Sequence, residues 1–177
     1  MILLVGQSAS GKTEIAKYLS SNYGIKKAIT NTTRPIRNGE RNGVDYYFLS
    51  KEEFLKLKEE NSLVESTIYN GNYYGCTKKE LGKDKCIVLE PEGIASFLKF
   101  SDGSMVVFLL KASKETRESR MLSRGDKKED IRKRLESDES RFDESKIKYD
   151  YAIKTDNRTI EELSRQIYNL YINRIEK

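Results

Sequence analysis

Eight consecutive residues near the start of the chain have the types and spacing of a loop that binds phosphate. The pattern G-x-x-x-x-G-K-[ST] is met by Gly6-Gln7-Ser8-Ala9-Ser10-Gly11-Lys12-Thr13. Its glycines permit backbone angles that turn successive N–H groups toward an anion. We expect the Lys12 side chain to be exposed to solvent and to reach the β- and γ-phosphates of a nucleotide, while the Thr13 hydroxyl binds Mg²⁺. The loop predicts phosphoryl transfer or nucleotide hydrolysis.

The segments on either side of this loop are the strand and the helix that such a loop needs. Residues 1–5 form a continuous apolar run, as expected of a strand buried on both faces. Apolar residues at helical spacing follow the loop, and Gly24 ends a helix expected from about Lys12 to Tyr23. This context favours a working phosphate loop over a chance match in a Gly/Ser turn.

The rest of the chain alternates predicted strands and helices, except in one polar, turn-rich stretch from residue 30 to about residue 80. Capping boxes begin two of the helices, at Ser50 and Thr159. Further core strands are expected at residues 86–89, 105–110 and 151–153. The polar stretch has only short predicted strands and a turn, at residues 46–49, 63–68 and 70–72. We therefore expect an α/β domain with a partly antiparallel insertion.

Composition narrows the class of protein. The length of 177 residues predicts one domain, and the net charge of +5 comes from 33 basic and 28 acidic residues interleaved along the chain. This distribution favours phosphate-rich small ligands over nucleic acid. The absence of histidine excludes a histidine-based triad, and a Cys/His zinc cluster with it. Two isolated cysteines and no membrane-length apolar stretch predict a soluble, cytoplasmic protein.

Two arginines and two tyrosines have the chemistry to bind a second phosphate. Arg34 and Arg37 flank a turn that Pro35 stiffens, and guanidinium groups bind phosphate through two parallel hydrogen bonds. Tyr46 and Tyr74 can each donate a phenol O–H to the same phosphate, because phenols in a folded protein prefer a polar partner to packing alone.

Three stretches and one acidic residue resemble the nucleoside-monophosphate site of guanylate kinases. They are Thr30-Asn31-Thr32-Thr33-Arg34-Pro35-Ile36-Arg37-Asn38-Gly39-Glu40, Gly43-Val44-Asp45-Tyr46-Tyr47-Phe48, Gly71-Asn72-Tyr73-Tyr74-Gly75 and Glu65. The resemblance covers nearly the whole chain. It implies a three-layer parallel-sheet P-loop kinase core with a small mixed-strand GMP-binding insertion and a helical lid. The implied limits are core 1–29, 81–115 and 142–177, GMP-binding region 30–80 and lid about 116–141.

The resemblance also implies an activity and a set of site residues. The enzyme would phosphorylate GMP and dGMP with ATP and Mg²⁺, without nucleic acid, membrane or an obligate protein partner. Residues 6–13 would bind ATP. The residues implied to bind GMP are Thr30, Arg34, Arg37, Tyr46, Glu65, Tyr74, Cys76 and Glu90. Those implied to act on the transferring phosphoryl group are Lys12, Arg37, Arg124 and Arg134. Thr13, with Glu90, would bind the metal ion.

Base selectivity would depend on Glu65, which can accept hydrogen bonds from N1–H and the 2-amino group of guanine. Adenine lacks this pair of donors, and a buried carboxylate without partners is costly. Cys76 stands where the family has Ser or Thr facing O6 of the base, and a thiol is a weaker donor than a hydroxyl. Leu89-Glu90-Pro91-Glu92-Gly93 departs from the family's Leu-Asp-x-Asp pattern, so Glu92 is the alternative to Glu90.

An arginine stripe marks the predicted lid. Arg117, Arg120 and Arg124 lie three and four residues apart and share one helix face, which by itself is typical of a solvated surface. The segment 120–125 resembles the entrance to the family's lid, and Arg134-Leu135 resembles its exit, with a lid about one residue shorter.

Two other functions are compatible with parts of this pattern. A guanylate-kinase-like binding module without activity would have no need of the intact phosphate loop or of the lid arginines. A kinase of another small phosphate, such as a ribose bisphosphate or a different nucleotide, is disfavoured by Tyr46, Glu65 and Tyr74, although Cys76 leaves this alternative open.

Overall fold

Two β-sheets organise the chain, and the larger one positions the phosphate loop. The computed structural model describes residues 1–69 and 71–176. All strands of the larger sheet are parallel, in the order β2-β7-β1-β8-β9. They are β1 (Ile2–Gly6), β2 (Lys26–Lys27), β7 (Lys85–Val88), β8 (Val106–Lys111) and β9 (Tyr151–Lys154). Because β1 lies between β7 and β8, the loop that follows β1 opens at the carboxyl edge where parallel sheets bind ligands.

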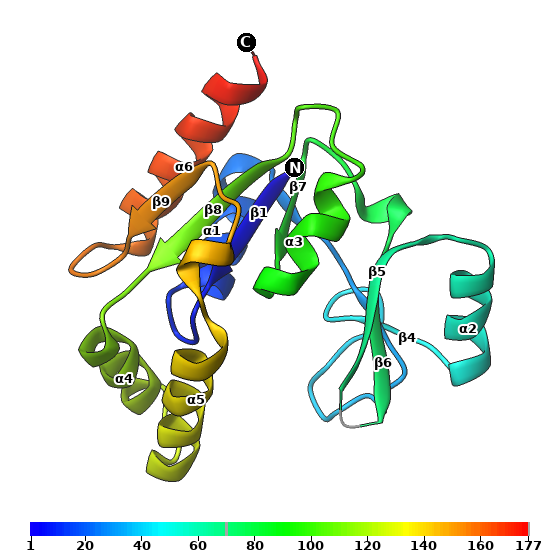
Figure 1. Cartoon of the computed structure of the whole chain (residues 1–177), viewed down its shortest axis with the longest axis horizontal. Coiled ribbons are helices and arrows are strands. Elements are labelled where there is room, and N and C mark those ends of the chain that lie inside the picture. The colour runs from blue at the N-terminus through cyan, green and yellow to red at the C-terminus, as the bar shows by residue number, and fades with distance from the viewer. Residues whose placement is uncertain (70, 177) are drawn as a thin grey trace.

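Helices cover both faces of this sheet and extend beyond it (Figure 1). The helices are α1 (Lys12–Tyr23), α2 (Lys51–Glu59), α3 (Pro91–Leu98), α4 (Lys114–Ser123), α5 (Lys128–Arg141) and α6 (Ile160–Ile175), with short 3-10 turns at Lys78–Glu80 and Glu144–Lys146. Of these, α1 and α6 pack on one face of the larger sheet and α3 packs on the other, whereas α2, α4 and α5 lie beyond it (Figure 1). Within residues 1–69 and 71–176, none of these helices combines the length and the apolar character that crossing a bilayer demands.

The central strand β1 is buried throughout and supplies two separate cores. Ile2 and Leu4 pack with residues of α1 and α6, whereas Leu3 and Val5 pack with residues of α3 on the opposite face. The two sets point in opposite directions because side chains alternate along a strand. The predicted three-layer parallel core is therefore confirmed.

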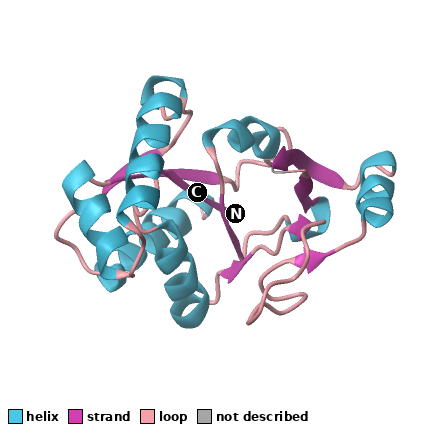
Figure 2. Cartoon of the chain, turned by 90° about the horizontal axis from the view of Figure 1, so that it is seen from below, coloured by secondary structure: helices cyan, strands magenta, loops and turns pink. Residues whose placement is uncertain are grey.

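A smaller mixed sheet stands to one side of the core, with α2 on its outer side (Figures 1 and 2). Its strand order is β4-β3-β6-β5, with β3 and β4 parallel and the other pairs antiparallel. The strands are β3 (Asn31–Thr32), β4 (Tyr47–Phe48), β5 (Leu63–Tyr69) and β6 (Asn72–Thr77). We call residues 30–80 the small-sheet region. Asn70 of the predicted turn lies outside the described residues, but Tyr69 pairs with Asn72 across it.

Helices α4 and α5 form a pair at the end of the core that carries the phosphate loop (Figure 1). Met121, Ile131 and Leu135 form a small apolar cluster between them. The solvated surface of which such an arginine stripe is by itself typical is not found at Arg117, because that side chain is 3% exposed. It is buried because its guanidinium pairs with Asp138 of α5.

The predicted ends of helices match the structure most closely where a capping residue or a glycine marks the end in the sequence. Helix α1 spans Lys12–Tyr23 and ends at Gly24, whose φ of 68° suits glycine. Both capping boxes form, at Ser50 and Thr159. The strand predicted at 46–49 shortens to Tyr47–Phe48. The limits given above for core, insertion and lid stay a prediction.

Candidate active site

The phosphate loop is closely fitted to the core sheet at its first residue. Gly6 pairs with Leu110 of β8, and a Cβ at this position would lie 2.5 Å from the Leu110 carbonyl oxygen. Gly11, with a φ of 103°, precedes the first turn of α1 as its N-cap. The free N–H groups at the start of that helix favour an anion. Only glycine gives the backbone both the space and the conformation that these two positions require.

Lys12 is held by the loop instead of projecting into solvent. Its Nζ donates to the carbonyl oxygens of Gly6 and Gln7, the latter at 3.0 Å. Burial lowers its pKa, although the Glu90 and Asp138 carboxylates act in the opposite direction. The expectation of an exposed Lys12 is therefore wrong, because the loop wraps around the ammonium group and satisfies it with its own carbonyls.

Side chains from helices α4 and α5 brace the same loop. Arg120 donates to the Ala9 carbonyl at 3.1 Å and to the hydroxyl and carbonyl of Thr155 at 3.1 and 2.7 Å. Asp138 accepts from the Ser8 backbone N–H at 2.9 Å and from the Ser8 hydroxyl at 3.2 Å. These contacts connect the loop with three elements that are distant in sequence.

One hydroxyl in the loop has no partner in the structure. Ser10 is 1% exposed, and its Oγ makes no hydrogen bond with the described residues. A buried polar group of this kind costs free energy unless a partner arrives. The residue lies inside the phosphate pattern, so a bound anion is the simplest partner for it.

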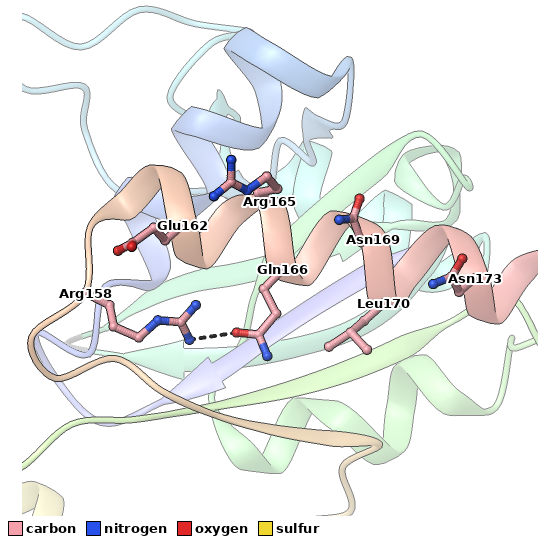
Figure 3. Close-up of a pocket in the computed structure, with 7 residues that line it drawn as sticks. All are labelled: Arg158, Glu162, Arg165, Gln166, Asn169, Leu170 and Asn173. Atoms are coloured by element: carbon pink, nitrogen blue, oxygen red, sulfur yellow. Dashed lines mark hydrogen bonds between the residues drawn. The ribbon is translucent and has the colours of Figure 1, made fainter.

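A hollow of about 560 Å³ adjoins the loop at Arg120. It is lined by Glu115, Thr116, Ser119, Arg120, Asn157, Arg158 and Thr159. A second hollow, of about 590 Å³, lies along the outer face of α6, where Arg158 donates to Gln166 at 2.7 Å (Figure 3). The first hollow is lined by Arg120, which donates to the loop at Ala9, so it is the candidate position for the nucleoside that carries the loop-bound phosphates.

The small-sheet region brings several of the predicted phosphate-binding residues together. The Arg34 guanidinium forms two hydrogen bonds with the Glu40 carboxylate, at 2.7 and 3.0 Å. It also lies 5.6 Å from the ring centre of Tyr46, and Tyr46 and Tyr74 make an edge-on ring contact at 6.4 Å. Hydrogen bonding to Glu40, and more weakly the Tyr74 phenol, raises the pKa of Arg34. Arg34, Tyr46 and Tyr74 therefore form one group.

Arg37 and Thr30 are less closely joined to this group. Arg37 is exposed, and its backbone N–H donates to the Glu40 carboxylate at 2.8 Å. Thr30 contributes its carbonyl oxygen to the backbone of Tyr47 at 2.9 Å. Their roles toward a monophosphate stay predictions.

Glu65 and Cys76 lie opposite each other on β5 and β6, in the same sheet as the group around Arg34. Burial raises the pKa of Glu65, while a hydrogen bond from the Cys76 backbone lowers it in part. The Cys76 side chain is 0% exposed, packs in the core cluster that contains Leu3, and donates weakly to the Thr77 carbonyl at 3.6 Å. A thiol closed off in this way does not support the predicted contact with a guanine base, which stays untested.

The two predicted lid arginines meet at one carboxylate. Arg124 donates to Asp126 through Nε at 2.9 Å and Nη2 at 2.6 Å, and Arg134 donates to the same oxygen at 3.2 Å. Their side chains are 47% and 51% exposed. Two guanidinium groups that share one carboxylate oxygen can share a phosphate oxygen in the same way.

The residues predicted to bind a metal ion lie at the loop and beside it. Thr13 is exposed in the first turn of α1, and Glu90 follows β7, where its charge acts on Lys12. Glu92, in the first turn of α3, has no such effect on Lys12. Among the described residues no three acidic or cysteine side chains gather into a metal site. The pair Thr13 and Glu90 fits Mg²⁺, which is usually held by one or two protein ligands together with substrate phosphates and waters.

Sequence reasoning missed the acidic partners of these cations and one of the arginines. Glu40 lies six residues from Arg34 and three from Arg37, and Asp126 lies two residues from Arg124 and eight from Arg134, so charge spacing along the chain could have found them. The bracing role of Arg120 has a weaker signal, its place in the arginine stripe. Asp138 has no sequence signal, because it is 130 positions from Ser8.

Comparisons with known proteins identify one family over most of the chain. A family model described as "Guanylate kinase" matches residues 1–170. The guanylate kinase of Synechococcus sp. (strain JA-3-3Ab) is 33% identical, over 95% of this chain and 82% of its own length. That of Fusobacterium nucleatum is 31% identical, over 99% of this chain and 97% of its own. The crystal structure of guanylate kinase from Anaplasma phagocytophilum superposes with a TM-score of 0.69 at 28% identity, over 98% of this chain and 84% of the other.

Proposed function

The chain belongs to the guanylate kinase family and phosphorylates GMP with ATP, and we propose that the residues described above perform this reaction in specific roles. The observation that supports these roles is that the fold holds two separate groups of residues with the chemistry to bind phosphate. One is the loop at residues 6–13, and the other is the group formed by Arg34, Tyr46 and Tyr74. A kinase of a nucleoside monophosphate needs both.

ATP is proposed to bind through its phosphates at the loop and through its nucleoside in the hollow at Arg120. Backbone N–H groups of the loop and the first turn of α1 would bind the β- and γ-phosphates. Lys12 would exchange its loop carbonyls for phosphate oxygens, which are better partners for a buried ammonium group.

GMP is proposed to bind in the small-sheet region. Arg34 and Arg37, with the phenols of Tyr46 and Tyr74, would bind its phosphate, and Glu65 would accept from the guanine edge. The ready-formed contact between Arg34 and Glu40 supports this role, because it orients the guanidinium before the substrate arrives. Deoxyguanosine monophosphate presents the same base and phosphate, so we expect it to be a substrate. We expect it to be slower than GMP because it lacks the 2′-hydroxyl group.

Transfer requires the GMP phosphate oxygen to approach the γ-phosphorus as the bond to the β–γ bridging oxygen breaks. Arg124 and Arg134 would then leave Asp126 for the transferring group, whose equatorial oxygens carry the developing charge. Mg²⁺, bound by Thr13 and Glu90 with the ATP phosphates, would neutralise part of that charge. We further propose that the small-sheet region and the α4–α5 pair move inward on binding, since in-line transfer excludes water and an always-closed site could not load two nucleotides.

The enzyme is proposed to act in the cytoplasm, where both of its cysteines would stay reduced. Cys76 and Cys86 are free and buried, as is usual for structural thiols in reducing compartments. No comparison favours an inactive binding module or a kinase of another small phosphate.

A coupled assay of ADP release across GMP, dGMP, AMP, CMP and UMP tests the proposal. We expect GMP to be the preferred acceptor, with dGMP slower and the other three poor. Equal turnover of GMP and AMP would contradict the assignment of Glu65. Removal of Mg²⁺ with a chelator should abolish turnover and be reversed by excess Mg²⁺.

A further inference from the structure

A carboxylate of the chain itself occupies part of the phosphate loop. Asp138, on α5, accepts from the Ser8 backbone N–H at 2.9 Å and from the Ser8 hydroxyl at 3.2 Å. Backbone N–H groups of such a loop are the groups that bind nucleotide phosphates. Asp138 therefore places a negative charge beside the position that the phosphates of ATP would take.

A buried arginine holds this carboxylate in place. Arg117, on α4, donates to Asp138 at 2.8 Å, and the two side chains are 3% and 17% exposed. The bond is made by Arg117 Nη1, and Arg117 Nε makes no hydrogen bond with the described residues. Because a buried guanidinium is costly without a counter-ion, Arg117 favours the conformation in which Asp138 faces the loop.

The charge of Asp138 reaches the functional groups of the loop. It is one of two carboxylates that act on the Lys12 ammonium, together with Glu90. When the phosphates of ATP bind at Lys12, the carboxylate becomes a like charge a few ångströms away, and repulsion at that distance is substantial in a partly buried site. Asp138 must then move away or weaken the binding of ATP.

We propose that Asp138 is an internal competitor of the ATP phosphates, which holds α5 against the empty phosphate loop and lowers the affinity for ATP. This inference rests on the proposed function, because it takes the loop to be the ATP site. Asp138 is a positioning residue and touches no reacting atom. It shares α5 with Arg134, so its displacement by ATP releases the helix that carries a proposed catalytic arginine.

The test compares Asp138→Asn with Glu139→Gln. Asparagine retains an oxygen that accepts from Ser8 but removes the charge. Glu139 is the neighbouring carboxylate and pairs with Lys114 at 2.7 Å, and among the described residues it forms no hydrogen bond or ion pair with the loop. Its variant changes the net charge equally. A double variant, Arg117→Leu with Asp138→Asn, removes the buried guanidinium that the single variant leaves unpaired.

The readouts are the dissociation constants of ATP, tripolyphosphate and GMP, measured by calorimetric titration at low and high salt. We expect Asp138→Asn and the double variant to bind ATP and tripolyphosphate roughly three- to tenfold more tightly, with the gain reduced at high salt. GMP affinity should not change, and Glu139→Gln should resemble the unmodified chain. A purely structural role for Asp138 would lower stability without tightening tripolyphosphate binding.

The outcomes separate the inference from the function on which it rests. If the unmodified chain binds ATP and neither Asp138 variant binds it more tightly, the inference is overturned and the proposed function stands. If Glu139→Gln tightens ATP binding equally, general charge accounts for the effect and the inference is again overturned. If the unmodified chain binds no ATP, the proposed function fails, and the inference fails with it.

Discussion

The two phosphate-binding parts of the molecule are built on different foundations. The phosphate loop follows a strand that is buried along its whole length, and contacts from β8, α4 and α5 hold it. In the small-sheet region the two-residue strands β3 and β4 are joined by the long connection 33–46, in which Ile36, Arg37 and Val44 are exposed. The phosphate loop is packed into the core, whereas Arg34 and Arg37 lie on an exposed connection, and it is β5 and β6 that join the small-sheet region to the core through Val64 and Cys76.

This difference indicates how the enzyme combines rigidity with access. The loop must hold a polyphosphate in one geometry, and a packed core provides that geometry before the substrate binds. The small-sheet region must admit GMP and then approach the loop, and its exposed connection at 33–46 can move at low cost. Ion pairs such as that between Arg34 and Glu40 keep its binding groups oriented meanwhile.

The largest expected effect is on turnover, and it tests whether Lys12 acts in phosphoryl transfer or only in the packing of the loop. Lys12→Met should lower turnover by about 10²- to 10³-fold or more, because it removes a charge that stabilises the transferring phosphoryl group. Lys17→Met is the matched control on the same helix, where Lys17 is exposed and pairs with Glu14 at 2.9 Å. Turnover is measured as ADP release, and thermal unfolding confirms that both variants are folded. Near-normal turnover in Lys12→Met would refute the role of the loop.

A pair of glycine substitutions tests the contrast in rigidity directly. Gly6→Ala should lower the free energy of unfolding by roughly 3 kcal/mol, because the new methyl group meets the Leu110 carbonyl at 2.5 Å. Gly39→Ala has open space around it and a φ of 84°, so only backbone strain remains, about 1 kcal/mol. Urea unfolding of the two variants measures the difference. Equal losses of unfolding free energy in Gly6→Ala and Gly39→Ala would contradict the difference in rigidity between the phosphate loop and the small-sheet region.

The orientation of Arg34 is tested by Glu40→Gln. Arg34 would lose its charged, two-point partner, so the KM for GMP should rise about three- to tenfold while kcat changes little. Glu60→Gln, on the surface after α2 and paired with Lys56 at 3.9 Å, serves as control. A fall in kcat at unchanged KM would show instead that Glu40 acts in the transfer step.

The smallest effect concerns stability and pH at Glu65. Burial raises the pKa of this carboxyl, so the folded state binds its proton more readily than the unfolded state, and the carboxylate destabilises the fold at neutral pH. Glu65→Gln should therefore stabilise the chain at pH 7 by about 1 kcal/mol or less. The gain should shrink as the pH falls through the raised pKa, because protonation relieves the unmodified chain of the same cost.

Urea unfolding at neutral and acid pH measures this gain, and GMP and AMP turnover measures what the substitution removes. Selectivity for GMP should fall in Glu65→Gln even as stability rises. A loss of stability at neutral pH would show that the Glu65 carboxylate has partners that stabilise it, and the proposed guanine contact would lose its support.

Much of the fold was predictable because it depends on neighbours in sequence. Helix α1 begins and ends where Gly11 and Gly24 place it, and the capping boxes at Ser50 and Thr159 involve residues three apart. The site was predictable as residue types, since the phosphate pattern and the Arg34 segment are contiguous. Its geometry was not: Lys12 was expected in solvent but is held by loop carbonyls, and Cys76, expected at a ligand, is buried in a core cluster.

The sequence by itself determined the chemistry of this protein: a loop for phosphates, forked cations, phenols, and the strand and helix that carry them. These features depend on composition and short-range spacing, and local backbone preferences follow from the same residues. Only the tertiary structure decided which charges meet. Arg117 became buried and Asp138 reached Ser8, 130 residues away, because packing α4 and α5 beside the loop brings them within hydrogen-bonding distance. Such contacts depend on how distant helices and strands pack together, and short sequence patterns do not predict them.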